Sequence, residues 1–314
     1  MAVRAADPRD LATTPLKPRK RRGRRRFTRR DRVVLTLMLG IPTLLHLSLI
    51  WFPAIASVVL SFGVWDGIGG LSAIKWVGTQ NYHEISSNYP PFWPAVQHNL
   101  IWLGFFLILA TPLGLLFAVI LDKEMKGSRL YQSALYTPVV LSLALVGFIW
   151  TLIYSQDDGL IDNLLNIHTD WYGNSSINLW AVMVAASWKH VGYIMILYLA
   201  GLKGVDTSIK EAASIDGASA WQAFRYVVFP ALKPVNIIVL VVTVIESLRA
   251  FDIVFIVNGG TNGLELLSVL IYNNILGEAS RIGFGSAIAV ILLIISLVFI
   301  VTYLFQVFRK EQES

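Results

Sequence analysis

Residues 203–234 read KGVDTSIKEAASIDGASAWQAFRYVVFPALKP, and this polar loop separates two apolar stretches that are each long enough to cross a membrane. These stretches cover residues 178–202 and 235–258. A hydrocarbon layer about 30 Å thick is spanned by roughly 20 apolar helical residues, because each residue rises about 1.5 Å. Four further stretches of this kind lie near residues 33–62, 96–121, 130–154 and 283–308. The sequence therefore predicts an all-α polytopic membrane bundle with six transmembrane helices.

The composition of the whole chain agrees with a membrane protein. Of its 314 residues, 55% are apolar and only 15% are charged, whereas a soluble domain carries about 25% charged residues. The many apolar residues exclude a disordered chain, and the absence of cysteine excludes disulfides, thiolate metal sites and a cysteine nucleophile. No GxxxxGK[ST] phosphate loop is present. We therefore expect neither catalytic residues nor a metal site nor a cofactor in this chain.

Positive charge is concentrated at the N-terminus. Residues 1–32 contain 13 of the 26 lysines and arginines and three acidic residues, so they carry a charge of +10, whereas the rest of the chain carries −4. This excludes a basic nucleic-acid-binding fold, because the charge belongs to a tail. Basic clusters beside a span are attracted to anionic lipid. We expect a disordered cytoplasmic tail that fixes topology and contacts membrane lipid, and no nucleic-acid partner.

The remaining basic residues predict the orientation of the spans. With the N-terminus in the cytoplasm, the inner segments hold 22 lysines and arginines and the outer segments hold only Lys75 and Arg281. Inner loops of membrane proteins are enriched in basic residues. Both termini are therefore predicted to be cytoplasmic. The chain divides into the basic tail 1–32, a six-span domain over 33–308 and a cytoplasmic end over 309–314.

The loop over residues 203–234 contains the signals of a first short helix. Ser208 and Glu211 have the spacing of a capping box, in which a hydroxyl and a carboxylate each satisfy an exposed backbone N–H. The pattern predicts a helix over about 208–216, and Asp216-Gly217 is expected to end it.

A second helix is predicted in the same loop. Ser219 and Gln222 form another capping pattern, for a helix over about 219–229, and Pro230 and Pro234 are expected to mark the return to the membrane. Small residues in the loop let another surface approach closely. The pattern alone supports equally a docking surface for another protein and a mere connection lying on the membrane.

The order of residues in this loop resembles the EAA loop of permease subunits of binding-protein-dependent ABC importers. The resemblance rests on Glu211-Ala212-Ala213, on Gly217, on Val227 and on Phe229-Pro230, where Val227 and Phe229 replace the usual Ile and Leu. Asp216-Gly217-Ala218 is similar to the carbohydrate-importing branch, the maltose-type permeases. The likeness covers residues 33–308, as further segments show: Pro53 to Phe62, Asn81-Tyr82, Pro138, Trp150, residues 199–202, residues 251–254 and Gly259-Gly260.

This resemblance implies a non-catalytic permease in the bacterial cytoplasmic membrane. With a second homologous permease subunit it would form the path for a saccharide, such as a disaccharide, an oligosaccharide or an amino sugar. Two ATPase subunits would bind ATP and Mg, and an extracytoplasmic solute-binding protein would deliver the solute. The residues implied to couple to the ATPase are Glu211, Ala212, Ala213, Asp216, Gly217 and Pro230. Glu211 would form an ion pair with the ATPase, and Gly217 would supply the turn.

Polar residues within the predicted fourth and fifth spans are candidates for the solute path. An ionisable residue at mid-bilayer costs about 2.5–3.5 kcal/mol on insertion scales, so each one suggests a function. The candidates are Trp188, Lys189, His190, Tyr193, Glu246, Arg249, Asp252 and Asn258. A structural interpretation is favoured over the solute path, because ion pairs between spans commonly hold such bundles together: Glu246 and Arg249 would neutralise each other, and Lys189 would pair with a carboxylate on a neighbouring helix.

Three alternatives fit the sequence less well. A self-sufficient secondary transporter of a small polar solute is expected to have two inverted halves, and no such repeat is evident. A membrane-bound enzyme would need a large catalytic region outside the membrane. A cation site at Asp157, Asp158 and Asp162 is disfavoured, because acidic residues around Gly159 are typical of a capped turn.

Overall fold

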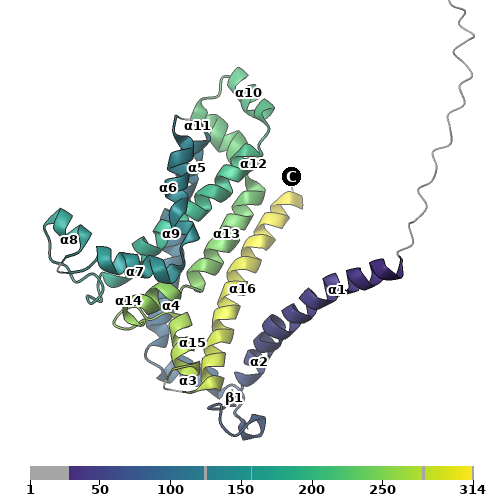
Figure 1. Cartoon of the computed structure of the whole chain (residues 1–314), viewed down its shortest axis with the longest axis vertical. Coiled ribbons are helices and arrows are strands. Elements are labelled where there is room, and N and C mark those ends of the chain that lie inside the picture. The colour runs from purple at the N-terminus through teal and green to yellow at the C-terminus, as the bar shows by residue number, and fades with distance from the viewer. Residues whose placement is uncertain (1–27, 124–125, 157, 278–279, 313–314) are drawn as a thin grey trace, which may run out of the picture. The chain divides into compact units, whose positions relative to one another are not determined.

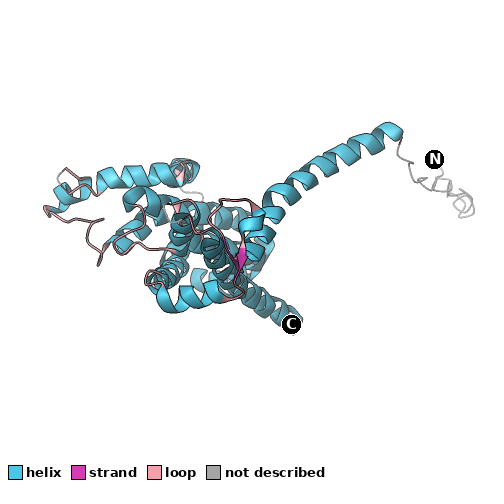
Figure 2. Ribbon diagram, turned by 90° about the horizontal axis from the view of Figure 1, so that it is seen from below, coloured by secondary structure: helices cyan, strands magenta, loops and turns pink. Residues whose placement is uncertain are grey.

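The computed structural model describes residues 28–123, 126–156, 158–277 and 280–312, and it confirms the all-α prediction (Figures 1 and 2). Most of the predicted basic tail lies outside the described residues. Up to residue 122 the elements are α1 (Arg29–His46), η2 (Leu47–Trp51), α2 (Phe52–Leu60), β1 (Gly63–Val64), η3 (Leu71–Ala73), β2 (Lys75–Trp76), α3 (Gln80–Asn88), α4 (Phe92–Phe105), η4 (Phe106–Ala110) and α5 (Thr111–Asp122).

The second part of the chain carries the predicted loop and the last spans. Its elements are α6 (Ser128–Val140), α7 (Leu143–Ile153), α8 (Leu160–Leu165), α9 (Asn178–Lys203), α10 (Thr207–Ile215), α11 (Ala220–Ala223), η5 (Phe224–Val228), α12 (Phe229–Ala231), α13 (Lys233–Leu248), α14 (Asp252–Asn258), α15 (Leu267–Ile275) and α16 (Ile282–Gln312). β1 and β2 form a small antiparallel pair in which Gly63 lies opposite Trp76.

Four helical segments of the described residues are long and apolar enough to cross a membrane: Arg29–Leu60, Phe92–Asp122, Asn178–Lys203 and Ile282–Val307. Two further candidates are bent pairs. α6 and α7 meet at 105°, and Ala220–Ala231 meets Lys233–Asn258 at 74°. The described residues thus contain six candidate spans if each bent pair is one span.

The predicted span over 130–154 is therefore not one straight helix. It breaks where Leu141 adopts an extended conformation and Ser142 begins α7 as its N-cap, with the Leu145 N–H donating to Ser142 Oγ at 3.2 Å. Pro138 lies in the last turn of α6 and has no N–H to continue the helical ladder. Ser142 then satisfies an exposed donor at the start of the next helix.

A π-helical turn precedes a proline at three places. η2 is followed by Pro53, η4 by Pro112 and η5 by Pro230, each two residues after the π-helical segment ends. In each case the residue before the proline donates its N–H to the carbonyl five residues earlier. A proline lacks the N–H and its ring crowds the carbonyl four residues back, and the wider turn relieves both problems. The helix predicted over about 219–229 therefore runs through Pro230 and ends at Ala231.

The chain separates into two compact units, residues 1–53 and 54–314. In the described part of the first unit, Thr28 caps α1: the Asp31 N–H donates to Thr28 Oγ1 at 3.2 Å, and the Thr28 N–H donates to Asp31 Oδ2 at 3.0 Å. No residue of α1 or η2 is buried, although both are largely apolar. Such a surface suits lipid or another membrane helix.

The core of the second unit is organised around α9, which contains many of its buried residues. Glycines let the neighbouring helices approach α9 closely. A Cβ added at Gly114 of α5 would lie 2.7 Å from Ile194 Cγ2, and one at Gly192 would lie 2.3 Å from the Leu135 carbonyl oxygen of α6. Small residues at such contacts are typical of membrane bundles, where close packing of backbones holds helices together.

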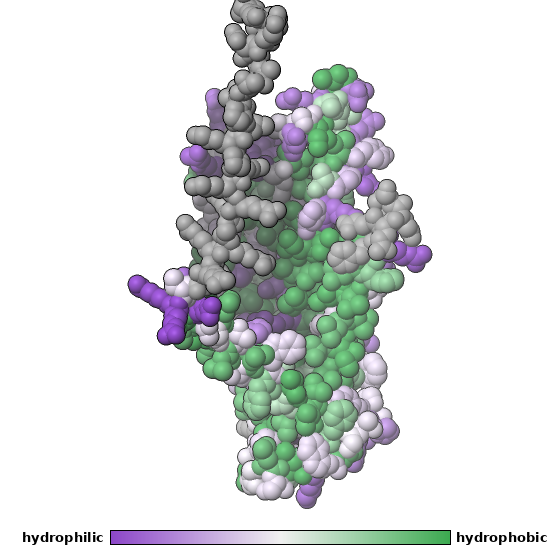
Figure 3. Space-filling view, turned by 90° about the vertical axis from the view of Figure 1, so that its right-hand side faces the viewer, coloured by the Kyte–Doolittle hydropathy of each residue, from purple (hydrophilic) through white to green (hydrophobic). Residues whose placement is uncertain are grey.

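The two ends of this unit differ in the elements they carry. In Figure 1, α10 and α11 lie at the top, whereas α3 and β1 lie at the bottom. Figure 3 shows hydrophobic side chains over much of the middle of one face and hydrophilic ones at its upper right edge. On α16 the exposed apolar residues include Leu293, Ile294, Leu297 and Val298. An apolar surface of this extent is typical of contact with lipid or with another membrane protein.

Candidate functional site

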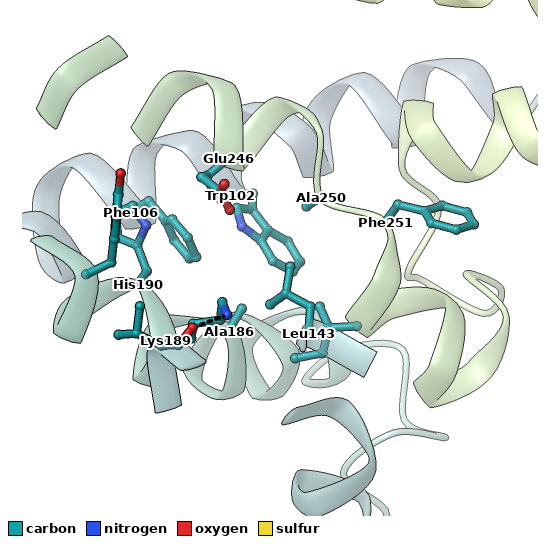
Figure 4. A pocket seen from close by; sticks show the side chains of 12 residues that line it. Trp102, Phe106, Leu143, Ala186, Lys189, His190, Glu246, Ala250 and Phe251 are labelled. Carbon is teal, nitrogen blue, oxygen red and sulfur yellow. Dashed lines mark hydrogen bonds between the residues drawn. The ribbon is translucent and has the colours of Figure 1, made fainter. Parts of the chain in front are cut away.

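A cavity of about 320 Å³ lies among helices of the second unit (Figure 4). It is bordered by the junction of α4 and η4, by the break between α6 and α7, by α9 and by the segment from α13 to α14. Its lining residues are Trp102, Phe106, Val139, Leu143, Ala186, Lys189, His190, Tyr193, Glu246, Ala250, Phe251 and Ile253. Four of the eight predicted solute-path residues thus lie together here: Lys189, His190, Tyr193 and Glu246.

Lys189 joins α9 to the break in the bent pair. Its Nζ donates to the carbonyl oxygens of Val139 at 2.7 Å and Leu141 at 2.5 Å. These carbonyls lie at the C-terminal end of α6, where the helix leaves acceptors without intrahelical partners and where a positive charge is favourable. The expected partner of Lys189 was a carboxylate, and that expectation is wrong because the broken helix supplies backbone acceptors instead.

His190, the residue after Lys189 in α9, belongs to a buried polar cluster. Its Nε2 lies 3.3 Å from Thr243 Oγ1 of α13 and 3.5 Å from Thr111 Oγ1 of α5, and the two hydroxyls lie 3.2 Å apart. The ring of Phe106 lies 4.5 Å from the His190 ring, centroid to centroid. The cluster ties three helices together. Sequence analysis missed Thr111, whose only signal was a hydroxyl beside Pro112 in an apolar run.

Glu246 and Trp102 supply two polar groups of the cavity that no described residue satisfies. Among the described residues, no basic nitrogen lies within 4.0 Å of the Glu246 carboxylate. The expected ion pair with Arg249 is therefore not formed, since α13 ends at Leu248 and Arg249 occupies its C-cap. Trp102 is 1% exposed, and its indole Nε1 has no hydrogen-bond partner. Figure 4 shows Trp102 and Glu246 on the wall opposite Lys189 and Ala186.

The other four predicted residues do not line this cavity. Trp188 is 39% exposed, and its ring forms a T-shaped pair with that of Trp150, with the two ring centroids 6.1 Å apart. Arg249 and Asp252 are exposed on either side of the turn between α13 and α14. Asn258 belongs to the turn that follows α14: its Nδ2 donates to the Thr261 carbonyl at 2.8 Å, and its Oδ1 accepts from the Gly260 N–H at 3.0 Å. Their assignment to the solute path stays a prediction.

The polar residues of α13 lie on two faces. Thr243 and Ser247 are buried, whereas Glu246 is exposed. Asn99, which sequence analysis missed, donates to the Leu248 carbonyl at 3.3 Å and accepts from the Leu267 N–H at 2.9 Å. This buried amide satisfies the C-terminal end of α13 and connects it to α4 and α15.

The predicted coupling loop forms two capped helices. Asp206, and not Ser208, caps α10, because the helix begins one residue earlier than expected, and Asp206 Oδ1 accepts from the Ser208 N–H at 2.9 Å. This hydrogen bond lowers the pKa of Asp206. The second capping box is confirmed: the Gln222 N–H donates to Ser219 Oγ at 3.3 Å, and the Ser219 N–H donates to Gln222 Oε1 at 2.8 Å.

Gly217 makes the turn between these two helices, as expected. Its φ of +80° lies in the left-handed region that favours glycine, and a Cβ added there would meet no atom within 4 Å. The requirement for glycine is therefore a backbone requirement and not a lack of space. Glu211, Ala212, Asp216 and Pro230 are exposed, whereas Ala213 is buried.

An ionic cluster attaches the loop to the spans. Asp122, the last residue of α5, lies 3.1 Å from Lys203 Nζ at the end of α9 and 3.5 Å from Lys210 Nζ on α10. Lys210 Nζ also donates to the Leu202 carbonyl at 3.4 Å. Three helices therefore meet at one carboxylate. Ion pairs near a protein surface contribute only about 0–1 kcal/mol to stability, so this half-exposed cluster sets position more than stability.

Beyond the membrane-spanning segments, Asp162 has a structural role. Its Oδ1 accepts from Trp171 Nε1 at 2.6 Å and its Oδ2 accepts from the Thr169 N–H at 2.7 Å. Asp157, the first residue of the acidic group considered above, lies outside the described residues. In the part of the chain that the structure describes, no group of three or more His, Asp or Glu side chains is arranged to hold a metal ion.

The sequence of this chain is similar to those of known membrane transport proteins. The family described as "Binding-protein-dependent transport system inner membrane component" matches residues 110–313. The arabinooligosaccharides transport system permease protein AraP of Halalkalibacterium halodurans is 31% identical over 302 residues, which cover 91% of this chain and 92% of the relative. The trehalose/maltose transport system permease protein MalF of Thermococcus litoralis is 32% identical over 238 residues, or 73% of this chain and 79% of the relative.

A solved structure has the same fold. It is that of a bacterial ABC transporter involved in the import of the acidic polysaccharide alginate; one of its chains superposes with a TM-score of 0.76 at 19% identity, over 89% of this chain and 96% of that chain. A second structure shows an alginate ABC transporter in complex with a periplasmic protein bound to an alginate pentasaccharide, with a TM-score of 0.74 at 18% identity over 87% of this chain and 93% of that one. At these identities the likeness shows the fold alone.

Proposed function

Since the chain belongs to the family of binding-protein-dependent transport system inner membrane components, we propose that it is a permease subunit of an ABC importer for a saccharide. The solute is a disaccharide, an oligosaccharide, an amino sugar or a related compound. Relatives named for arabinooligosaccharides and for trehalose and maltose support this class. So does the cavity, because hydroxyl-rich solutes are recognised by polar side chains and aromatic faces together.

The chain requires partners for this activity. A second homologous permease completes the path, two ATPase subunits supply ATP and Mg, and an extracytoplasmic solute-binding protein delivers the solute. The solved alginate transporter with its periplasmic protein supports the last of these. We place the chain in the bacterial cytoplasmic membrane, with each bent pair serving as one span, six spans in all and both termini in the cytoplasm.

The observation that carries the coupling assignment is the surface of the loop. Ile215, Trp221 and Tyr226 are 86%, 69% and 74% exposed. Large apolar side chains that stay exposed on a polar loop are typical of a protein interface. Glu211 is exposed on the same α10 helix and is available for an ion pair with a basic group of the ATPase. The cluster at Asp122 then transmits movement of α10 to the ends of α5 and α9.

The alternative of a self-sufficient secondary transporter is not favoured by the family. An uptake experiment separates the two. The chain, its partner permease and the ATPase subunits are reconstituted in proteoliposomes with the binding protein, and radiolabelled maltose and arabinobiose are offered as probes. We expect uptake that requires ATP and that persists when ionophores collapse the ion gradients. Uptake that survives without ATP and stops with the ionophores would refute the proposal.

A further inference from the structure

The cavity holds one carboxylate without a basic partner and one buried N–H donor without an acceptor. From this combination we infer that the cavity binds an uncharged, hydroxyl-bearing ring and discriminates against an anionic one. The inference rests on the proposed function, because it assigns the chemical class of the solute that occupies the proposed path.

Glu246 supplies the acceptor. An ionised carboxylate accepts several hydrogen bonds and donates none. Neighbouring hydroxyls of a sugar ring are donors that match its two oxygens, and hydrogen bonds to a charged group are stronger than neutral ones. A solute carboxylate or phosphate has no proton to offer at neutral pH and adds a like charge beside Glu246 in surroundings less polar than water, where repulsion is larger.

Trp102 supplies the donor. An indole N–H only donates, and that of Trp102 finds no acceptor in the described residues although the side chain is 1% exposed. A buried donor without a partner is unfavourable. The nitrogen itself has almost no accessible surface, so a ring or hydroxyl oxygen of a solute satisfies it only when the indole turns toward the cavity. The two groups therefore demand both a donor and an acceptor from the same solute, and a hydroxyl offers both.

The positive groups near the cavity do not pair with Glu246. Lys189 also lines the cavity and keeps its positive charge, but its Nζ donates to the carbonyls of Val139 and Leu141 on the wall opposite Glu246 (Figure 4). Arg249 does not line the cavity. His190 Nε2 is within hydrogen-bond distance of the Thr111 and Thr243 hydroxyls. Glu246 therefore remains the charged group of this cavity that has no partner within the described chain.

The rest of the lining suits one face of a sugar ring. Phe106 and Tyr193 contribute aromatic surface, whereas the ring of Phe251 points away from the other lining side chains and packs against Phe255 and Tyr272 (Figure 4). The volume of about 320 Å³ lies at the lower end of the range of about 300–1,000 Å³ for small-molecule sites. The cavity thus accommodates a short part of a larger saccharide, and the remainder would extend toward the partner permease.

A matched pair of probes tests the inference. Methyl α-glucoside and methyl α-glucuronide share one ring and differ in an uncharged hydroxymethyl group against a carboxylate. Their affinities for the permease–ATPase complex in nanodiscs, without the binding protein, are measured by saturation-transfer NMR titration. We expect the glucoside to bind at least about tenfold more tightly, since the glucuronide places a like charge close to Glu246 among mainly apolar side chains.

Variants assign the discrimination to its residues. Glu246→Gln should bring the two affinities to within about threefold, because it removes the repulsion. The control Asp252→Asn removes a carboxylate outside the cavity and should leave the tenfold ratio unchanged. Trp102→Phe should weaken both probes to a similar extent and preserve their ratio.

Several results would overturn the inference. They are equal binding of the two probes to the wild-type complex, tighter binding of the glucuronide, an unchanged ratio in Glu246→Gln, and no binding of either probe. ATP-driven uptake in proteoliposomes is recorded in parallel. If ATP-driven uptake persists but the expected ratio of the two affinities is not observed, only the inference about charge is wrong. If ATP-driven uptake is absent, the proposed function is wrong, whatever the ratio.

Discussion

Replacement of Lys189 by methionine tests how the break between α6 and α7 is held. The wild-type amine donates to two backbone carbonyls, Val139 and Leu141. Methionine keeps much of the apolar volume of the stem but offers no donor, so both carbonyls lose a charged partner. Hydrogen bonds to charged groups contribute about 1.5–3 kcal/mol each. Taking the lower value for each bond, the end of α6 is expected to lose about 3 kcal/mol, which corresponds to about a hundredfold change in an equilibrium constant.

The change should be local, because the lost bonds lie at one helix end. Hydrogen–deuterium exchange of the purified chain in nanodiscs measures it directly. In Lys189→Met, the amides of residues 141–146 should exchange about a hundredfold faster, while those of α15 keep their wild-type rates. Lys189→Arg retains a positive donor and should produce a much smaller increase. Lys75→Met removes an exposed lysine in β2 and serves as the matched control.

Exchange in residues 141–146 within threefold of wild type would refute the reasoning, provided that Lys189→Met inserts normally. A uniform increase across the whole second unit would also contradict it, since that would show a general loss of stability and not the release of one helix end.

Three further predictions follow from the packing and the loop. Asp122→Asn should change stability by less than about 1 kcal/mol but should lower the uptake obtained per ATP hydrolysed in proteoliposomes; unchanged coupling would argue against a positioning role. Gly217→Val places a β-branched residue at a positive φ and should cost at least about 1–2 kcal/mol locally, so less ATPase should co-purify with this variant. Gly217→Asn should retain most of the ATPase. Equal recovery of ATPase with both variants would contradict the role of the Gly217 turn in docking. Gly114→Ala should lower the thermal unfolding temperature, because overpacking costs about 1–3 kcal/mol, while Gly104→Ala, where an added Cβ meets no atom within 4 Å, should not; the reverse order would be inconsistent with the α5–α9 packing.

The parts of the fold that depend on local sequence could be predicted. Long apolar runs place the helices, and the Ser219–Gln222 box and the Gly217 turn follow from spacing alone, because their partners lie three residues apart or within one residue's own backbone. The predicted start of α10 lies one residue too late. Asp and Ser are both favourable N-cap residues, and the sequence alone gives no rule to choose between Asp206 and Ser208. Only the structure shows which hydrogen bonds form.

The parts that depend on contacts between helices could not be predicted. The carbonyls that hold Lys189 exist because α6 ends at a break that Pro138 and Ser142 signal only weakly in an apolar run. The i, i+3 spacing of Glu246 and Arg249 suggested an ion pair, but it assumed that the helix continues to Arg249. Likewise, the partners of His190 come from two other helices, and no spacing within one span reveals them.

We propose that the loop over residues 203–234 docks on an ATPase, and site-directed cross-linking tests this docking directly. The chain contains no cysteine, so single cysteines can be introduced into the wild-type background. Ile215→Cys, at a site that is 86% exposed on α10, and Leu164→Cys, at a site that is 73% exposed on α8, are each labelled with a benzophenone maleimide in the assembled importer and irradiated. We expect a cross-link from position 215 to the ATPase subunit and none from position 164. Absence of that cross-link from position 215 in a complex that imports its solute with ATP would contradict the proposed docking.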